Sequence, residues 1–235
     1  MAAFLVGIAK TAIGGVATIA VAIYAAVLPA RESTAALLLV LLVGDLLAVA
    51  YYHRACDWRL IRHLLPGVLP GLVLGTAVLA VVDDGTLRRG IGALLLGLLL
   101  LQLWLRRPST GELGRAPWGL PARTATGLGA GFTTMVANAA GPVMTLYLLG
   151  QRVDKLAFLG TSAWFFLCVN LTKVPFSAGL GLMNASMLIS TVLVAPLVVA
   201  GGLVGARLVR QLHQQAFEVA VLSASAVSAA ALLVG

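Results

Sequence analysis

Five polar side chains interrupt the long apolar stretches of this chain. Lys10 lies in the first stretch, Asp45 in the second, and Asn138 in a later one. Asn170 and Lys173 follow three residues apart, so they share one face of a predicted helix. Ionisable side chains inside a membrane are costly and face a cavity or a partner. These residues therefore predict a binding site for a small ion.

The charges at Lys10 and Asp45 leave two roles open for the carboxylate. Asp45 could be the ion-pair partner of Lys10, or it could carry a proton and so couple proton movement to anion movement. Lys173 also has two interpretations, because its amine could attract an anion or extend to the membrane surface. Asp45 is the candidate coupling residue.

The segments 2–29 and 123–150 are both interrupted near their middles. The first break contains Gly14 and Gly15, and the second runs from Asn138 to a Gly-Pro pair that ends at Pro142. Proline is favoured in the first turn of a helix, where its missing N–H costs nothing. A helix that restarts at each break would point its free N–H groups and its partial positive charge at an anion.

The two breaks therefore predict an anion site built from both tips. The candidate substrate-binding residues are Lys10, Thr11, Gly14, Gly15, Val16, Thr134, Asn138, Ala139, Ala140, Gly141, Asn170 and Lys173.

Composition assigns the chain to the membrane. Of its 235 residues, 60% are hydrophobic and 10% are charged, whereas soluble domains are near a quarter charged. Apolar runs near 20 residues recur along the chain, as in a multi-pass protein. The net charge of +8 fits positive-inside topology in a lipid bilayer better than nucleic-acid binding. The sequence shows no catalytic, nucleotide-binding or metal-binding motif, so no enzyme activity, cofactor or metal is expected.

The interrupted segments are too long for simple spans, and their half-helices of about 12 residues would rise about 18 Å, to the bilayer midplane. We expect an all-α protein with eight helical segments: a hairpin at 2–29, spans at 34–52, 64–82 and 88–105, a cytoplasmic linker at 106–122, a hairpin at 123–150, and spans at 157–177, 185–206 and 215–234.

An offset of 125 residues aligns the two halves of the chain. It places Asp45 on Asn170 and the first break on the second. The predicted repeats are 1–105 and 123–235, each with one hairpin and three crossings. An odd number of crossings inverts the second repeat relative to the first, an arrangement found in secondary transporters.

The distribution of basic residues favours re-entrant hairpins over crossings, although long kinked helices remain an alternative. If all eight segments cross, the two sides receive equal numbers of basic residues. With hairpins, only Arg31, Arg88 and Arg89 face outward, and one side receives Arg54, Arg59, Arg62, Arg106, Arg107, Arg115, Arg123, Arg152, Lys155, Arg207 and Arg210.

A family resemblance lies in the stretch GLGAGFTTMVANAAGPVMTLYLLGQRVDKLAFLGTSAWFFLCVNLTKVP and also in AIGGVATIAVAIYAAVLPARESTAALLLVLLVGDLLAVAYYHRACDWRLIRHLLPG. The first resembles the second-half signature of the sulfite exporter TauE/SafE family, and the resemblance covers nearly the whole chain. It implies a permease of the bacterial inner membrane for sulfite, organosulfonates or related carboxylates. The first tip is shorter than the three-glycine form usual in that family.

Two other functions remain as alternatives. Cys168 in the sixth segment could contact a thiosulfate-type substrate in an importer, or the protein could be a non-transporting membrane scaffold. The expected partners are a small anionic substrate, with or without a coupled proton, and the lipid bilayer. The chain could be a monomer or a homodimer.

Overall fold

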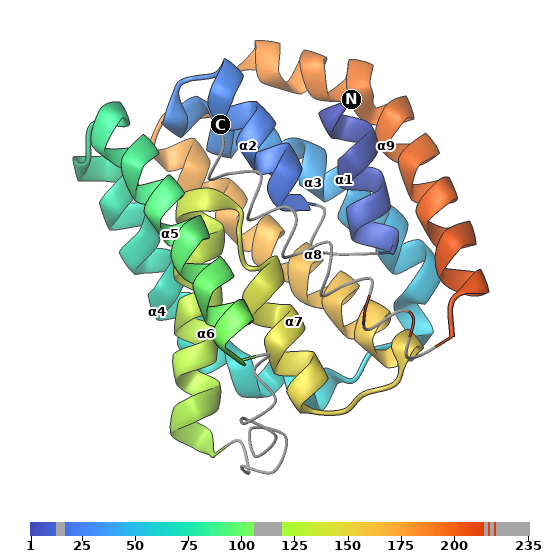
Figure 1. Ribbon diagram of the computed structural model, residues 1–235. Coiled ribbons are helices and arrows are strands. Elements are labelled where there is room, and N and C mark those ends of the chain that lie inside the picture. The colour runs from blue at the N-terminus through green and yellow to red at the C-terminus, as the bar shows by residue number, and fades with distance from the viewer. Residues whose placement is uncertain (13–16, 106–118, 214–215, 217–218, 220–235) are drawn as a thin grey trace.

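The computed structural model describes residues 1–12, 17–105, 119–213, 216 and 219. All secondary structure in these ranges is helical, as expected (Figure 1). The helices are α1 (Ala2–Thr11), α2 (Ala17–Val27), α3 (Ala30–Tyr52), the short 3₁₀ helix η2 (His53–Ala55), α4 (Trp58–Val81), α5 (Asp84–Leu105), α6 (Leu120–Ala137), α7 (Gly141–Gly150), α8 (Lys155–Gly179) and α9 (Ala185–Gln211).

Four of the described helices are long and apolar enough to cross a membrane. They are α3 together with η2, α4, α8 and α9. They cover the segments expected at 34–52, 64–82, 157–177 and 185–206, and α5 covers the one expected at 88–105. The segment expected at 215–234 lies outside the described residues except for 216 and 219. The molecule is therefore an all-helical membrane protein.

Helix α6 begins at Leu120, inside the segment 106–122 that was expected to be a linker. Pro121 lies in its first turn, where a missing N–H leaves no hydrogen bond unmade. The proline that we read as part of a polar connection therefore starts the helix. The rest of the expected linker, 106–118, lies outside the described residues.

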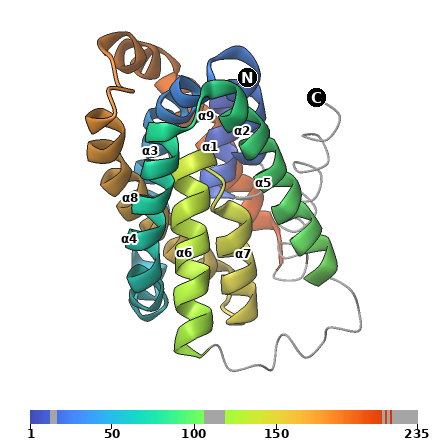
Figure 2. The same ribbon diagram turned by 90° about the vertical axis from the view of Figure 1, so that its left-hand side faces the viewer.

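The second interrupted segment forms two short helices that meet at a tip. Figures 1 and 2 show the start of α6 and the end of α7 at the same end of the molecule, and the N-terminus at the opposite end. Asn138 ends α6 in the left-handed region, with φ 52°, and Pro142 lies in the first turn of α7 as predicted. The first segment is likewise divided into α1 and α2, but its break at 13–16 lies outside the described residues.

Glycines let α4 and α6 pack backbone against backbone. A Cβ atom at Gly67 would lie 2.0 Å from the carbonyl oxygen of Thr124, and one at Gly71 would lie 2.3 Å from that of Leu128. Gly131 faces back in the same way, with Val68 O at 2.2 Å from a Cβ there. The regular glycine spacing therefore marks a close contact within the chain, as expected from small residues at helix interfaces.

Helix α1 packs against α9 by the same means. A Cβ atom at Gly7 would lie 2.1 Å from Val198 O, and one at Gly201 would lie 2.1 Å from Phe4 O. Together with α4 and α6, this is the most extensive helix pairing in the described part of the chain. Each interrupted segment therefore rests its first helix on a long helix from the other half of the sequence.

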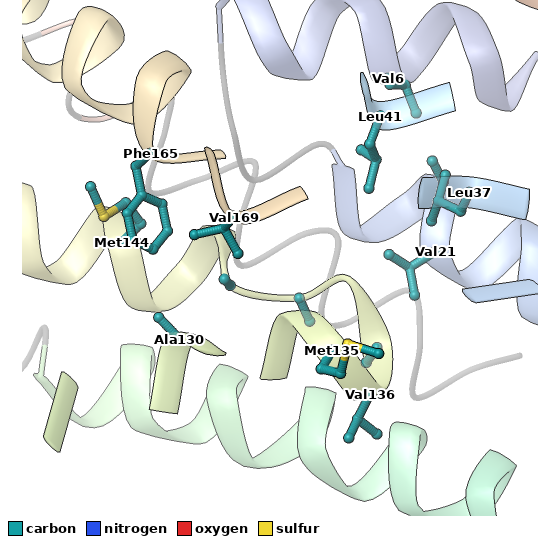
Figure 3. Packing of buried hydrophobic residues seen from close by; sticks show 14 of the residues in the cluster. Val6, Val21, Leu37, Leu41, Ala130, Met135, Val136, Met144, Phe165 and Val169 are labelled. Carbon is teal, nitrogen blue, oxygen red and sulfur yellow. The ribbon is translucent and has the colours of Figure 1, made fainter. Parts of the chain in front are cut away.

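Apolar side chains fill the space around the interrupted segments. Figure 3 shows Leu37 and Leu41 of α3 close to Val6 of α1 and Val21 of α2, and Met144 of α7 beside Phe165 of α8. All of these side chains are buried. The interrupted segments thus contribute side chains to the apolar core.

Polar side chains start several of the helices. Asp57 accepts a hydrogen bond from Arg59 N at 2.9 Å, Asp154 from Leu156 N at 2.9 Å, and Asn184 from Met187 N at 2.9 Å. Such N-caps satisfy backbone donors that the helix leaves free. Between α4 and α5, the N–H of Thr86 bonds Asp83 at 3.0 Å and so lowers the pKa of that exposed carboxyl.

The α4–α6 contact predicts different effects for two glycines on one helix. Gly131→Ala should destabilise the protein by about 1–3 kcal/mol, because its methyl group would overlap Val68 O. Gly129→Ala is the matched control, since nothing lies within 4 Å of a Cβ there. Thermal unfolding in detergent measures both. Equal stability of the two variants would contradict this account of the contact.

Candidate functional site

Lys10 and Asp45 form an ion pair between α1 and α3. The ammonium nitrogen lies 2.7 Å from one carboxylate oxygen, and the Asp45 side chain is 0% exposed. Lys10 also lies over the ring of Phe166 on α8, 4.2 Å from its centroid. Pairing is what makes two charges tolerable away from water. The structure thus contains the pairing that the sequence left as one of two roles for Asp45.

Asn170 holds the other oxygen of the same carboxylate. Its side-chain nitrogen donates to Asp45 Oδ2 at 2.7 Å, which joins α8 to α3. Both side chains are fully buried. The two residues are the pair that the offset of 125 aligns, and they are in direct contact.

Lys173 lies one turn beyond Asn170 and is fully buried. Its nitrogen donates to Thr134 O at 2.7 Å and to Asn138 Oδ1 at 2.5 Å. Two longer contacts reach Thr134 Oγ1 at 3.3 Å and Asn170 Oδ1 at 3.4 Å. The interpretation in which this amine extends to the membrane surface is wrong, because oxygens at the end of α6 and at the second tip bind it inside the protein.

Asn138 joins the second tip to α3. Its side-chain nitrogen donates to Thr34 O at 2.9 Å, while its side-chain oxygen accepts from Lys173. Its backbone N–H donates to Thr134 O at 2.9 Å, which closes the end of α6. Asparagine adopts the left-handed conformation more readily than most residues. Asn138 therefore holds the second tip against α3 and against Lys173.

These contacts form one continuous polar chain through the apolar interior. Asp45 and Thr34, where the two tips attach to α3, are about 16 Å apart along that helix. The chain bridges this distance, and its members in order are Lys10, Asp45, Asn170, Lys173, Asn138 and Thr34.

A cavity lies beside this chain and takes walls from both interrupted segments. Its volume, measured as the space open to the centre of a water-sized sphere, is about 40 Å³. One water molecule needs about 10–15 Å³ by the same measure. The cavity thus has room for a few waters or a small ion. Its lining residues are Ala9, Lys10, Ala17, Leu41, Asp45, Thr134, Asn138, Gly141, Met144, Thr145, Phe158, Leu159, Ser162, Ala163, Phe166 and Asn170.

The structure separates the predicted site residues into three groups. Those that line the cavity are Lys10, Asp45, Thr134, Asn138, Gly141 and Asn170. Those that are buried elsewhere are Thr11, Ala139, Ala140 and Lys173. Gly14, Gly15 and Val16 lie outside the described residues.

Thr11 belongs to the helix contact and does not line the cavity. Its hydroxyl donates to Gly202 O at 2.8 Å, and its own carbonyl accepts from the Tyr52 hydroxyl at 2.8 Å. It therefore ties the end of α1 to α9 and to the end of α3.

Sequence reasoning missed a row of cavity residues on α8. Phe158, Ser162 and Phe166 line the cavity together with Asn170. They recur every four residues, a spacing that puts them on one face of a helix. This spacing was visible in the sequence, and it could have extended the site from Asn170. That Phe166 lies under Lys10 depends on how α1 packs against α8.

Two further features bear on alternatives and metals. Cys168 is half-buried and is not among the residues that line the cavity. Across the residues that the structure describes, no group of three or more His, Cys, Asp or Glu side chains could hold a metal ion.

A model of the family described as "Sulfite exporter TauE/SafE" matches residues 1–232. The chain belongs to the sulfite exporter TauE/SafE family. TauE/SafE proteins are membrane transporters of sulfur-containing anions, so the buried polar chain lies in a member of a transporter family. Comparisons with curated proteins and with solved structures gave no significant match.

The ion pair predicts the outcome of a double-mutant cycle that measures stability. Lys10→Met should destabilise the protein by about 3 kcal/mol, because it leaves the carboxylate of Asp45 buried without its countercharge. Lys10→Met combined with Asp45→Asn should recover most of that loss, since the uncharged amide still meets Asn170. Unfolding midpoints in detergent measure the cycle. A double variant no more stable than Lys10→Met would show that the pair is not the source of the effect.

Proposed function

We propose that this protein is a secondary transporter that moves a small anion across the bacterial inner membrane by alternating access. The substrate class is sulfite, an organosulfonate or a related sulfur-containing or carboxylate anion. One observation carries the proposal: a cavity enclosed by both interrupted segments, lined by a buried lysine and two carboxamides.

The donors around the cavity suit an anion. Lys10 supplies a charged N–H group, and Asn138 and Thr145 supply a carboxamide and a hydroxyl. Gly141 lines the cavity where α7 begins, so the positive end of that helix faces it. Free N–H groups at a helix start bind anions readily. A small oxyanion could thus bind between the amine and the second tip.

The apolar walls strengthen this binding. Phe158, Phe166 and Met144 line the cavity together with the polar groups. Charge–charge attraction is stronger in a medium of low dielectric constant than in water. A bound ion must exchange its hydrating water for protein donors. The narrow apolar walls therefore disfavour a large ion that keeps its hydration shell.

Contacts between the halves support a repeat with inverted halves. The offset of 125 maps α1 onto α6 and α4 onto α9, and the pairs α1–α9 and α4–α6 have the most extensive contacts. The same offset relates Asp45 and Asn170, which meet at the seam between α3 and α8. We infer that alternating access rearranges this seam while the glycine-lined contacts stay closed.

Asp45 remains the candidate for proton coupling. An anion that attracts the Lys10 amine would compete with the carboxylate 2.7 Å away. A carboxylate that loses its countercharge in an apolar interior takes up a proton more easily. Anion binding and protonation of Asp45 would then occur together.

The proposal predicts sulfite binding that depends on the cavity residues. Sulfite should raise the unfolding temperature of the purified protein, and Lys10→Ala or Asn138→Ala should weaken sulfite binding at least about ten-fold by removing a charged or amide donor. Arg54→Gln is the matched control, because it removes one positive charge at an exposed position outside the cavity. Thermal shift and isothermal titration measure both effects.

Two results would count against this function. Sulfite affinity that is unchanged in both Lys10→Ala and Asn138→Ala would exclude the cavity as the binding site. Loss of thiosulfate uptake in Cys168→Ser, with sulfite binding absent from the wild type, would favour the importer that uses a thiol contact.

The hairpin model predicts that Glu32 and Arg152, both exposed, face opposite sides of the membrane. If all eight segments crossed, the two residues would share one side. In a background with Cys56→Ser and Cys168→Ser, Glu32→Cys should react with an impermeant maleimide in intact cells. Arg152→Cys should react only after permeabilisation. Labelling of both cysteines under the same condition would rule out the re-entrant hairpins.

A further inference from the structure

The buried polar chain contains two amines and one carboxylate. Lys10 is paired with Asp45 at 2.7 Å, so their charges offset each other. In the part of the chain that the structure describes, the oxygens that contact the Lys173 nitrogen come from Thr134, Asn138 and Asn170, and none of them is a carboxylate oxygen. The three side chains therefore sum to one positive charge when all are ionised.

The contacts of Lys173 favour the protonated form of its amine. Four oxygen atoms contact its nitrogen, and the two closest are a carbonyl and a carboxamide oxygen at 2.7 and 2.5 Å. These two can only accept hydrogen bonds, and an ammonium group has three donors and no acceptor. A neutral amine has only two N–H donors, so it could bond these two oxygens but would leave the contact with Asn170 Oδ1 at 3.4 Å without a donor.

The contacts of Asp45 favour the ionised form of its carboxyl group. One oxygen faces the Lys10 ammonium from α1, and the other accepts a hydrogen bond from Asn170 of α8. The charged group in direct contact with Asp45 is thus positive, which favours the anionic form.

We propose that the empty site holds one net positive charge, contributed by Lys173, and that each transported particle brings one net negative charge. The cargo is then a monoanion, such as hydrogen sulfite or a sulfonate, or a dianion that arrives with a proton for Asp45. This inference rests on the proposed function of the same cavity. Lys173 acts as a countercharge and positioning residue, because it does not line the cavity.

The two carboxamides explain why Lys173 attracts the anion without touching it. Both present their oxygens to Lys173, so the nitrogen of Asn138 points to Thr34 O and that of Asn170 points to Asp45. Lys173 thereby fixes the orientation of both amides. An unbalanced charge in an apolar interior is costly, and an anion in the adjacent cavity relieves that cost.

A charge cycle at two positions tests the proposal, with sulfite as the probe and isothermal titration as the measurement. Lys173→Gln removes the extra charge and should weaken sulfite binding at least about ten-fold. Lys173→Gln combined with Asp45→Asn leaves Lys10 as the charge of the site, and its sulfite affinity should return to within about three-fold of the wild type. A purely structural role for Lys173 predicts no recovery, because its contacts are absent from both variants.

The single variant Asp45→Asn gives an independent check, since it should raise the charge of the site by one. In mildly alkaline buffer, where sulfite is a dianion, it should bind sulfite at least as tightly as the wild type. Weaker binding there, or a double variant as weak as Lys173→Gln, would overturn the charge assignment. Wild-type protein that binds no sulfite would instead overturn the proposed function, and the two failures are therefore distinct.

Discussion

The buried carboxylate of Asp45 is the constraint on which the rest of the structure depends. A charge at that depth needs both an opposite charge and hydrogen-bond donors. Lys10 and Asn170 supply them, at 2.7 Å each. To do so, α1 must end beside the middle of α3, and α8 must lie along the same helix. The positions of α1 and α8 against α3 are therefore tied to one side chain.

Close backbone contacts make that arrangement possible. Gly7 and Gly201 bring α1 against α9, and Gly71 and Gly131 bring α4 against α6. A side chain at any of these positions would overlap backbone atoms of the neighbouring helix. The first helix of each interrupted segment is thus supported by a long helix from the other half of the chain.

Membership of the TauE/SafE family gives the class of cargo, and the cavity adds the physical basis for binding it. Lys10, which lines the cavity, and Lys173, which does not, have different roles. Lys10 lies at the wall, where an anion can reach it, while Lys173 holds the second tip through Asn138.

The sequence by itself determined the helical membrane class and the interruption at Asn138 and Pro142. These follow from apolar length and from the backbone limits of proline, both of which are local properties. It also offered Asp45 as a partner for Lys10.

Only the tertiary structure decided what surrounds each buried polar group. It placed Phe166 under Lys10 and Thr11 in the α1–α9 contact. It also brought the Lys173 amine within hydrogen-bonding distance of oxygens next to the second tip. A sequence shows that a lysine is buried in an apolar stretch, but the partner of its charge lies on another helix. That partner is fixed by how the helices pack, because hydrogen bonds extend only about 3 Å.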